Sequence, residues 1–158
     1  MSLAIRAATD RDSETIADFN QQLALESEHV VLSPKTVLEG VQRGLSRPDL
    51  CRYFVAELEN RIVGQSMITF EWTDWRNGVI WWLQSVYVAP SHRRQGIFTA
   101  LFRHIEGSAH SDPDVRALRL YVHHDNVRAI RTYEQLGLPL SAYRVCESDW
   151  SGATTRSL

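Results

Sequence analysis

One stretch near the middle of the chain constrains the fold most. An apolar run (residues 81–88) leads into a basic turn, and helical spacing of apolar residues follows (97–106). The first N–H groups of a helix lack partners within the helix and carry the positive end of its dipole, so a phosphate binds there when the backbone comes close. Gly96 permits that approach, and Arg93 and Arg94 add positive charge. The stretch therefore predicts a strand, an anion-binding turn and a helix.

The other periodicities predict a single α/β domain. Alternating runs rich in aromatic and β-branched residues predict strands, and apolar residues three and four apart predict helices. Strands are expected at 3–7, 52–58, 62–73, 79–88, 117–123 and 143–147, and helices after Thr9 and at 33–44, 97–108 and 126–136. Short turns join the second, third and fourth strands in an antiparallel meander. The helix that follows the fourth strand makes the fourth and fifth strands parallel neighbours.

Length and charge exclude several classes of protein. A chain of 158 residues fits one domain over 1–158, and only the Ser/Thr/Gly-rich segment 151–158 is a candidate flexible tail. The formal net charge of -2 gives no general basic field for nucleic acid. Without an apolar run of about 20 residues, a membrane span is not expected, and the polar N-terminus favours the cytoplasm. Cys51 and Cys146 lie too far apart in sequence to suggest a zinc site or a disulfide framework.

Two blocks of the sequence resemble the GNAT superfamily of N-acetyltransferases. The family pattern Q/R-x-x-G-x-G/A after a strand is met by Arg93-Arg94-Gln95-Gly96-Ile97-Phe98, and N-x-x-A-x-x-x-Y-x-x-x-G is met by NVRAIRTYEQLG, from Asn126 to Gly137. The resemblance covers nearly the whole chain. It implies a mixed, mostly antiparallel central sheet flanked by helices, with two parallel central strands that splay apart.

The resemblance also implies acetyl-CoA, or another acyl-CoA, as co-substrate. Its pyrophosphate would lie on the backbone of Gln95, Gly96, Ile97, Phe98 and Thr99, with Arg93 and Arg94 beside it. Its pantetheine arm would pair with the backbone of Val86, Tyr87 and Val88 and contact Asn126, and an N–H near Val86 would polarise the thioester carbonyl. If the resemblance is set aside, the basic turn is an ordinary solvated turn, Val86 and Val88 are core residues, and Asn126 is a helix N-cap. Phe98 departs from the pattern, and its place on the apolar stripe predicts that its ring points into the core.

Tyr133 is the candidate general acid. It lies two helical turns after Asn126, so both project from one face of the last helix. A phenol with a reference pKa of about 10 can protonate a departing thiolate whose reference pKa is about 8.5, which is the role that the family gives this tyrosine. The structural alternative is a half-buried core tyrosine.

The general base and the acceptor site are predicted from single residues. An alkylamine is mostly protonated at pH 7, so a base is required, and Glu71 is preferred over Glu26 and Glu28, although a solvent-facing strand glutamate is an equal alternative. Glu28, Trp72 and Trp82 are the expected acceptor-binding residues. Alternation puts Trp81 and Trp82 on opposite faces of the sheet, so only one of them can line a pocket; aromatic pairing across the hairpin is the alternative reading of these tryptophans.

No metal is expected. In His123-His124-Asp125, adjacent histidines at the end of a strand are expected to point apart, and no third ligand follows at a fixed spacing. The expected activity is acetyl transfer from acetyl-CoA to a primary amine of a small molecule, by direct attack in a ternary complex. The alternatives are a protein or peptide N-acetyltransferase and a non-catalytic acyl-CoA sensor. The oligomeric state is left open, with a homodimer as the candidate because it is the commonest oligomer, and nucleic-acid and membrane partners are not expected.

Overall fold

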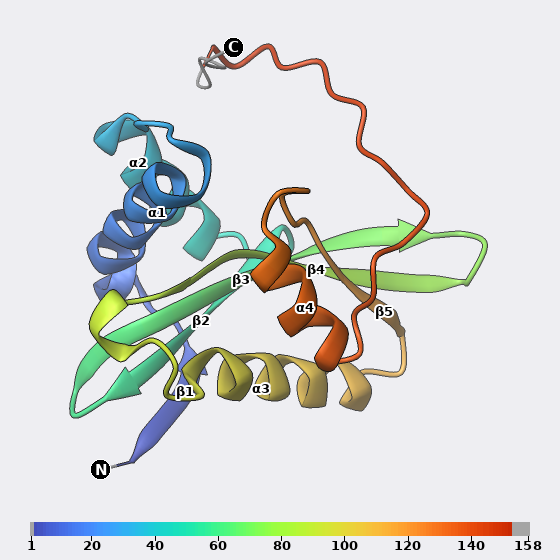
Figure 1. Ribbon diagram of the computed structural model, residues 1–158, viewed down its shortest axis with the longest axis horizontal. Coiled ribbons are helices and arrows are strands. Elements are labelled where there is room, and N and C mark those ends of the chain that lie inside the picture. The colour runs from blue at the N-terminus through green and yellow to red at the C-terminus, as the bar shows by residue number, and fades with distance from the viewer. Residues whose placement is uncertain (1, 153–158) are drawn as a thin grey trace.

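A computed structural model describes residues 2–152 and shows one central sheet with helices on both of its faces (Figure 1). The strands are β1 (Leu3–Ala7), β2 (Cys51–Leu58), β3 (Arg61–Thr73), β4 (Gly78–Val88) and β5 (Val115–Leu120). The helices are α1 (Ser13–Glu28), α2 (Pro34–Leu45), α3 (Ile97–Ser111) and α4 (Val127–Gln135), with short 3-10 turns η1 (Asp10–Asp12) and η2 (Pro90–His92). Most of the predicted tail, 153–158, lies outside the described residues.

The sheet has the predicted connectivity. Its five strands lie in the order β1-β2-β3-β4-β5, antiparallel except for the parallel pair β4 and β5. The tight turn between β2 and β3 is formed by Glu59 and Asn60, which both have positive φ angles (50° and 61°). Such a turn matches the twist of the two strands that it joins.

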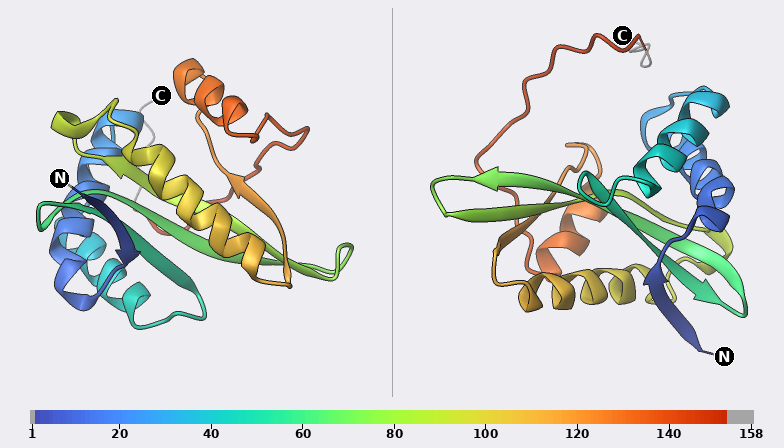
Figure 2. Two further views of the ribbon diagram at one scale, coloured as in Figure 1. Left: turned by 90° about the horizontal axis from the view of Figure 1, so that it is seen from below. Right: turned by 180° about the vertical axis from the view of Figure 1, so that it is seen from behind.

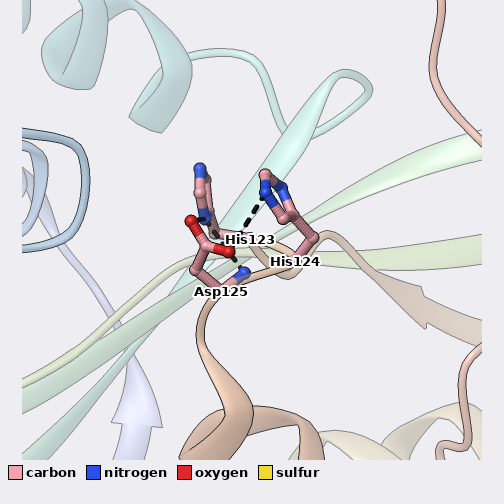
Figure 3. Close-up of side chains that lie close together, drawn as sticks. All are labelled: His123, His124 and Asp125. Carbon is pink, nitrogen blue, oxygen red and sulfur yellow. Dashed lines mark hydrogen bonds and ion pairs between the residues drawn. The ribbon is translucent and has the colours of Figure 1, made fainter.

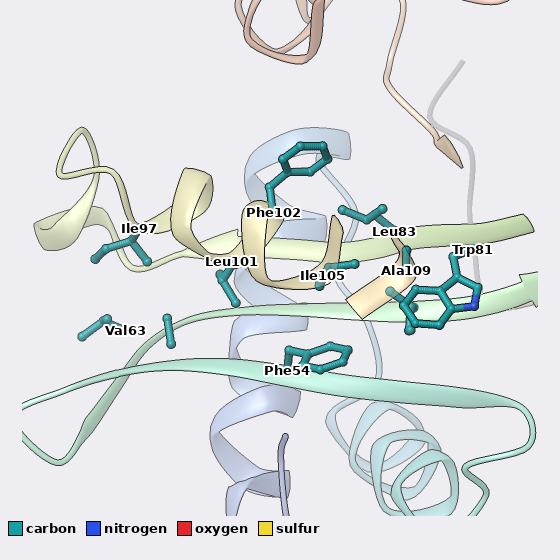
Figure 4. Close-up of a cluster of buried hydrophobic side chains, with 11 residues drawn as sticks. Phe54, Val63, Trp81, Leu83, Ile97, Leu101, Phe102, Ile105 and Ala109 are labelled. Carbon is teal, nitrogen blue, oxygen red and sulfur yellow. The ribbon is translucent and has the colours of Figure 1, made fainter. Parts of the chain in front are cut away.

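Alternation along β2 divides the interior into two cores. Phe54 and Ala56 belong to a cluster with α3, whereas Tyr53 and Val55 belong to a cluster with α1 and α2. Since successive side chains of a strand point to opposite faces, α1 and α2 cover one face of the sheet and α3 covers the other. Figure 4 shows the α3 core, in which the apolar side chains of the helix pack against those of the strands. The views from below and from behind show the same layering (Figure 2).

The structure differs from the sequence prediction near the C-terminus. β5 begins at Val115 and ends at Leu120, so it starts and stops earlier than predicted. The strand predicted at 143–147 is wrong: these residues are extended but pair with no strand of the described chain. A strand needs a neighbour for its backbone hydrogen bonds, and the chain leaves the sheet after α4 (Figure 1). No helix among the described residues is long and apolar enough to cross a bilayer.

Candidate active site

A bulge in β4 lies at the centre of the candidate site. Gln65 pairs with Tyr87 and Met67 with Gln84, so two residues of β4 stand opposite one residue of β3. Within this bulge Ser85 has a φ of 51°, a left-handed conformation that a side chain seldom adopts. The extra residue bends β4, and beyond this point β4 no longer pairs with β5.

Two buried polar side chains of β3 hold the bulge. The Gln65 amide donates from Nε2 to the Ser85 carbonyl (3.1 Å) and to Asn20 Oδ1 of α1 (2.7 Å). The Ser66 hydroxyl donates to the Gln84 carbonyl (3.5 Å). Gln65 is fully buried and its Oε1 has no partner among the described residues. Buried polar groups normally find partners, so these contacts explain why glutamine and serine replace apolar residues in the middle of this strand.

The bulge opens one edge of β4. Pairing between β4 and β5 ends at Leu83 and Leu120, so the backbone of residues 84–88 has no strand on that side among residues 2–152. A pocket of about 300 Å³ lies there between β4, α1 and α4. It is lined by the predicted donor-binding residues Val86, Tyr87, Val88, Arg93 and Asn126 and, from α1, by Leu23, Glu26 and Ser27. The structure therefore brings together residues that the sequence places in two separate blocks.

One wall of this pocket is a network that the sequence did not predict. The Tyr87 hydroxyl lies 2.8 Å from Gln22 Oε1 and 3.1 Å from Glu26 Oε1. Burial, and then the hydrogen bond with Glu26, raise the pKa of Tyr87. Glu26 Oε2 also pairs with Arg93 (2.6 Å), whose Nε donates to the Val88 carbonyl (2.9 Å). The Arg93 guanidinium thus points toward α1, and Glu26, predicted only as an alternative base, is a structural residue of the pocket.

The turn before α3 has the backbone conformation that the anion-binding prediction requires. Gly96 has a φ of 78°, and a Cβ there would meet no atom within 4 Å. The first hydrogen bond of α3 runs from Ala100 N to the Gly96 carbonyl (2.9 Å), which leaves the N–H groups of the first turn available to a ligand. Arg94 is exposed beside them, and Gln95 Nε2 donates to the Ser91 carbonyl (3.3 Å).

Phe98 packs as predicted. Its ring contacts those of Phe102 (centroids 6.3 Å apart) and Tyr133 (5.8 Å), and it lies against the α3 core. Burial raises the pKa of Tyr133 above its ordinary value, so the phenol keeps its proton at neutral pH. Asn126 caps α4, because its Oδ1 accepts from Ala129 N (3.2 Å). The second sequence block thus places a protonated phenol beside the helix that follows the turn.

The face of the sheet opposite α3 carries an aromatic and charged cluster. Trp82 stacks on Tyr121 (centroids 4.4 Å apart), and the Arg119 guanidinium lies 5.8 Å from the Trp82 ring centroid. Arg119 Nη1 also pairs with Glu71 Oε2 (3.2 Å). Trp81 is buried in the α3 core, so the predicted separation of the two tryptophans is confirmed.

The other predicted acceptor residues stand apart from this cluster. Trp72 is 65% exposed near the end of β3, and Glu28 is exposed at the end of α1. Within the described chain, neither makes a polar or ring contact with the Trp82 cluster. Sequence reasoning missed Arg119 and Tyr121, because the sequence does not give the register of β5 against β4, which puts Arg119 opposite Trp82.

His123, His124 and Asp125 lie close together in the loop after β5 (Figure 3). The prediction that the two histidines point apart is wrong: their rings stack with centroids 4.6 Å apart. Strand alternation does not apply to them, because β5 already ends at Leu120. All three side chains are exposed, and His124 Nε2 lies 3.1 Å from Asp125 Oδ1. This geometry is that of a surface ion pair when the His124 imidazole is protonated. The expectation that the protein binds no metal stays a prediction.

Comparison with known families shows which family the fold belongs to. The model of the acetyltransferase (GNAT) family matches residues 17–138. The chain belongs to this family. GNAT members use acetyl-CoA, so the family assigns acyltransferase chemistry to the fold described above.

Solved structures agree with the family assignment. A possible acetyltransferase from Clostridium difficile 630 is 38% identical, with a TM-score of 0.88 over 94% of this chain and 98% of that one. A predicted acetyltransferase with acetyl-CoA from Clostridium acetobutylicum has a TM-score of 0.76 at 16% identity, covering 93% and 96% of the two chains. A ribosomal-protein-alanine N-acetyltransferase from Brucella melitensis biovar Abortus 2308 has a TM-score of 0.75 at 15% identity, covering 95% and 100%. At these lower identities the likeness concerns the fold.

Proposed function

We propose that this GNAT member transfers an acetyl group from acetyl-CoA to a primary amine. The single observation that carries the proposal is the open edge of β4 at residues 84–88. It continues directly into the glycine turn, and Asn126 of the second sequence block lines the same pocket. One ligand with an extended amide arm and a pyrophosphate would fit both the edge and the turn.

The backbone would bind the donor. Acetyl-CoA supplies the acetyl group as a thioester. The edge from Val86 to Val88 would pair with the amides of the pantetheine arm, and the N–H groups of the first turn of α3, at Ile97 to Thr99, would bind the pyrophosphate. Arg94 would add its positive charge there, while Arg93 stabilises the wall of the pocket through its ion pair with Glu26. A preorganised N–H near Val86 would polarise the thioester carbonyl.

Tyr133 would act as the general acid. The lone pair of the amine nitrogen attacks the carbonyl carbon, a C–N bond forms and the C–S bond breaks, and Tyr133 gives its proton to the departing sulfur. Burial raises the pKa of Tyr133, so the phenol carries the proton that it would give to the sulfur. Glu71 stays the predicted base, and because it lies opposite Ile80, six residues along β4 from Val86, the proton that the amine loses would reach it through a chain of waters.

The acceptor side favours a second candidate within the same chemistry. Trp72 is 65% exposed and Glu28 is exposed, so these two predicted acceptor residues face solvent. An open approach admits an amine carried on a peptide or protein as readily as a small molecule. A non-catalytic acyl-CoA sensor is the alternative from another class, and the presence of Tyr133 argues against it.

The experiment is a screen for release of free CoA from acetyl-CoA. The acceptors are alkylamines, amino acids, polyamines, aminoglycosides and peptides with free N-termini or lysines. We expect turnover with at least one class and a mass increase of one acetyl group on the acceptor amine. Acetyl-CoA binding without turnover across the whole panel would support the sensor, and an O-acetylated product would contradict the amine assignment.

A further inference from the structure

Arg119, in the Trp82 cluster, has hydrogen-bond donors to spare. Its guanidinium is held over two rings, 5.8 Å from the Trp82 ring centroid and 5.7 Å from that of Tyr143. Its Nη1 pairs with Glu71 (3.2 Å), whereas Nε and Nη2 have no hydrogen-bond partner among residues 2–152. The side chain is 28% exposed, so a ligand can reach it. A guanidinium that is fixed in position and has one free edge suits the bidentate binding of a carboxylate.

The register of the sheet fixes how far this arginine lies from the proposed donor pocket. Arg119 is opposite Trp82, and Trp82 stands four residues before Val86, with one residue of that interval taken up by the bulge. At about 3.3 Å per residue, the two positions are about 10–13 Å apart along β4. Gln84 and Thr69 lie between them, bonded to each other (2.6 Å) and only partly buried. An acceptor can therefore reach from Arg119 to the proposed thioester position across this face.

The carboxylates around the donor pocket are poorly placed to deprotonate a strongly basic amine. Glu26 is the one carboxylate among the described residues that line the pocket, and it is already bonded to Arg93 and Tyr87. Glu71 is reached only through waters. At pH 7.5 an α-amino group, with a reference pKa of about 7.7–8.0, is roughly one-third neutral, whereas a lysine amine, at about 10.4, is roughly 0.1% neutral. The site therefore suits an α-amine, which needs little help from a base.

We propose that the acceptor is a peptide with a free N-terminus and an acidic side chain at its third or fourth residue, whose carboxylate binds Arg119. In an extended peptide these residues lie about 7–10 Å from the first, and the acidic side chain covers the remaining distance. The carboxylate uses Nε and Nη2, so the pair with Glu71 stays intact. The inference rests on the proposed acetyl transfer for the identity of the reactive amine, but the carboxylate site can be tested without any reaction.

The first test measures peptide binding by calorimetry in the presence of excess CoA, which carries no acetyl group. Two tetrapeptide amides with free N-termini are compared, one with glutamate and one with glutamine at the fourth position. We expect the wild type to bind the glutamate peptide about 10- to 100-fold more tightly, as charge-assisted hydrogen bonds predict. Arg119→Gln, with an unchanged circular dichroism spectrum, should bring the ratio to about one. Equal affinities in the wild type, or a preference that survives Arg119→Gln, overturn the proposal.

Arg103→Gln is the matched control for this measurement. Arg103 also makes one ion pair, with Glu106 (2.6 Å), and lies 5.5 Å from the Phe102 ring centroid, but it belongs to α3 on the other side of the sheet. This variant should keep the preference for glutamate. Arg119→Lys retains the charge and loses the fork, so it should keep only part of the preference. If Arg103→Gln loses the preference as well, net charge attracts the peptide and the Arg119 site is wrong.

The second test compares rates of acetylation at pH 7.5. The glutamate peptide is set against a peptide with a blocked N-terminus and a lysine at its first position, and we expect kcat/KM to be at least about tenfold higher for the free N-terminus. Faster acetylation of lysine overturns the α-amine assignment. If amines are acetylated without regard to the glutamate, acetyl transfer stands and this inference is wrong. If binding depends on glutamate but no acceptor is acetylated, the carboxylate site stands and the proposed function is wrong.

Discussion

The proposed donor pocket (around residues 84–99) and the proposed acceptor face (the Trp82 cluster) are built in different ways along the same strand. The donor pocket depends on backbone: a bulge at Ser85, an open strand edge and a glycine turn, all within residues 84–99. The acceptor face depends on side chains that three strands and a loop bring together, with Glu71, Trp82, Arg119 and Tyr121 in contact. The glycine turn is set by its local sequence, whereas the bulge is held by Gln65 of β3 and Asn20 of α1, and the Trp82 cluster by contacts among three strands. The turn can therefore be recognised from the sequence, and the bulge and the acceptor side chains cannot.

Replacing Tyr133 should have the largest effect. Removal of a general acid costs roughly 10² to 10⁴ in turnover, so Tyr133→Phe should lower kcat by that factor and leave the Kd of acetyl-CoA within about twofold. Because burial raises the pKa of Tyr133 above its ordinary value near 10, the loss should be equal at pH 7 and pH 9. Tyr53→Phe removes a phenol from the other core and is the control. Unaltered turnover in Tyr133→Phe would remove the acid role.

A stability variant far from both regions sharpens the comparison. The Asp12 carboxylate accepts from Arg6 (2.8 and 3.0 Å) and from Thr9 N (2.7 Å). Asp12→Asn should lower the free energy of unfolding by about 1–3 kcal/mol at pH 7, with Kd and KM unchanged. Arg6 lowers the pKa of Asp12, so this stabilisation is present above the unfolded-state pKa of about 3.9 and is lost as pH falls through the folded-state pKa.

Urea titrations at pH 7 and pH 2.5 measure this effect. The wild type should lose more stability between the two pH values than Asp12→Asn does. Asp10→Asn, an exposed neighbour on the same turn, is the control. Equal pH dependence in wild type and Asp12→Asn would show that the Arg6 contact adds nothing to stability.

Truncation of Trp82 should affect only the acceptor. A cationic amine over a tryptophan face is worth about 0.5–2 kcal/mol, so Trp82→Ala should raise the acceptor KM by roughly 2- to 30-fold at an unchanged Kd for acetyl-CoA. Trp75→Ala, at the exposed β3–β4 turn, should change neither constant. A fall in acetyl-CoA affinity as large as the rise in acceptor KM would break the division between donor pocket and acceptor face.

The smallest effect is expected from loosening the bulge. Gln65→Leu keeps the volume but removes the donor to the Ser85 carbonyl and to Asn20. One such hydrogen bond is worth about 1 kcal/mol, so the Kd of acetyl-CoA should rise by roughly fivefold while the acceptor KM stays the same. Gln21→Leu, at a partly exposed position of α1, is the matched control. If the acceptor KM rises instead, the bulge serves the acceptor and its assignment to the donor pocket is wrong.

Local patterns were enough to predict the strands, the helix starts and the glycine turn, but not the bulge. Alternation in β3 and β4, the Ser33 cap of α2 and the glycine before α3 each determine the conformation of their own neighbourhood. The same is true of Phe98, whose place on the helical stripe predicted that it packs into the core. Local chemistry decides these features, so one sequence suffices.

Contacts between distant segments could not be predicted in this way. The pairing of Glu26 with Arg93, and of Gln65 with Asn20, requires knowing that α1 crosses the bulge. The early end of β5 was missed because its apolar run continues toward His123 without a break in pattern. The extended residues 143–147 do have the composition of a strand, but a strand also needs a neighbour, and composition does not supply one.

The most direct test of the central claim is calorimetry of acetyl-CoA binding to two glycine variants. Gly96 and Gly137 both have positive φ angles (78° and 90°), and a Cβ at either position would meet no atom within 4 Å, so glutamate strains both backbones alike. Only Gly96 lies at the proposed pyrophosphate site. We expect wild type and Gly137→Glu to bind acetyl-CoA with similar affinity and Gly96→Glu to lose at least about 100-fold, since a carboxylate would repel the pyrophosphate. Equal affinity in all three proteins would contradict this placement of the donor.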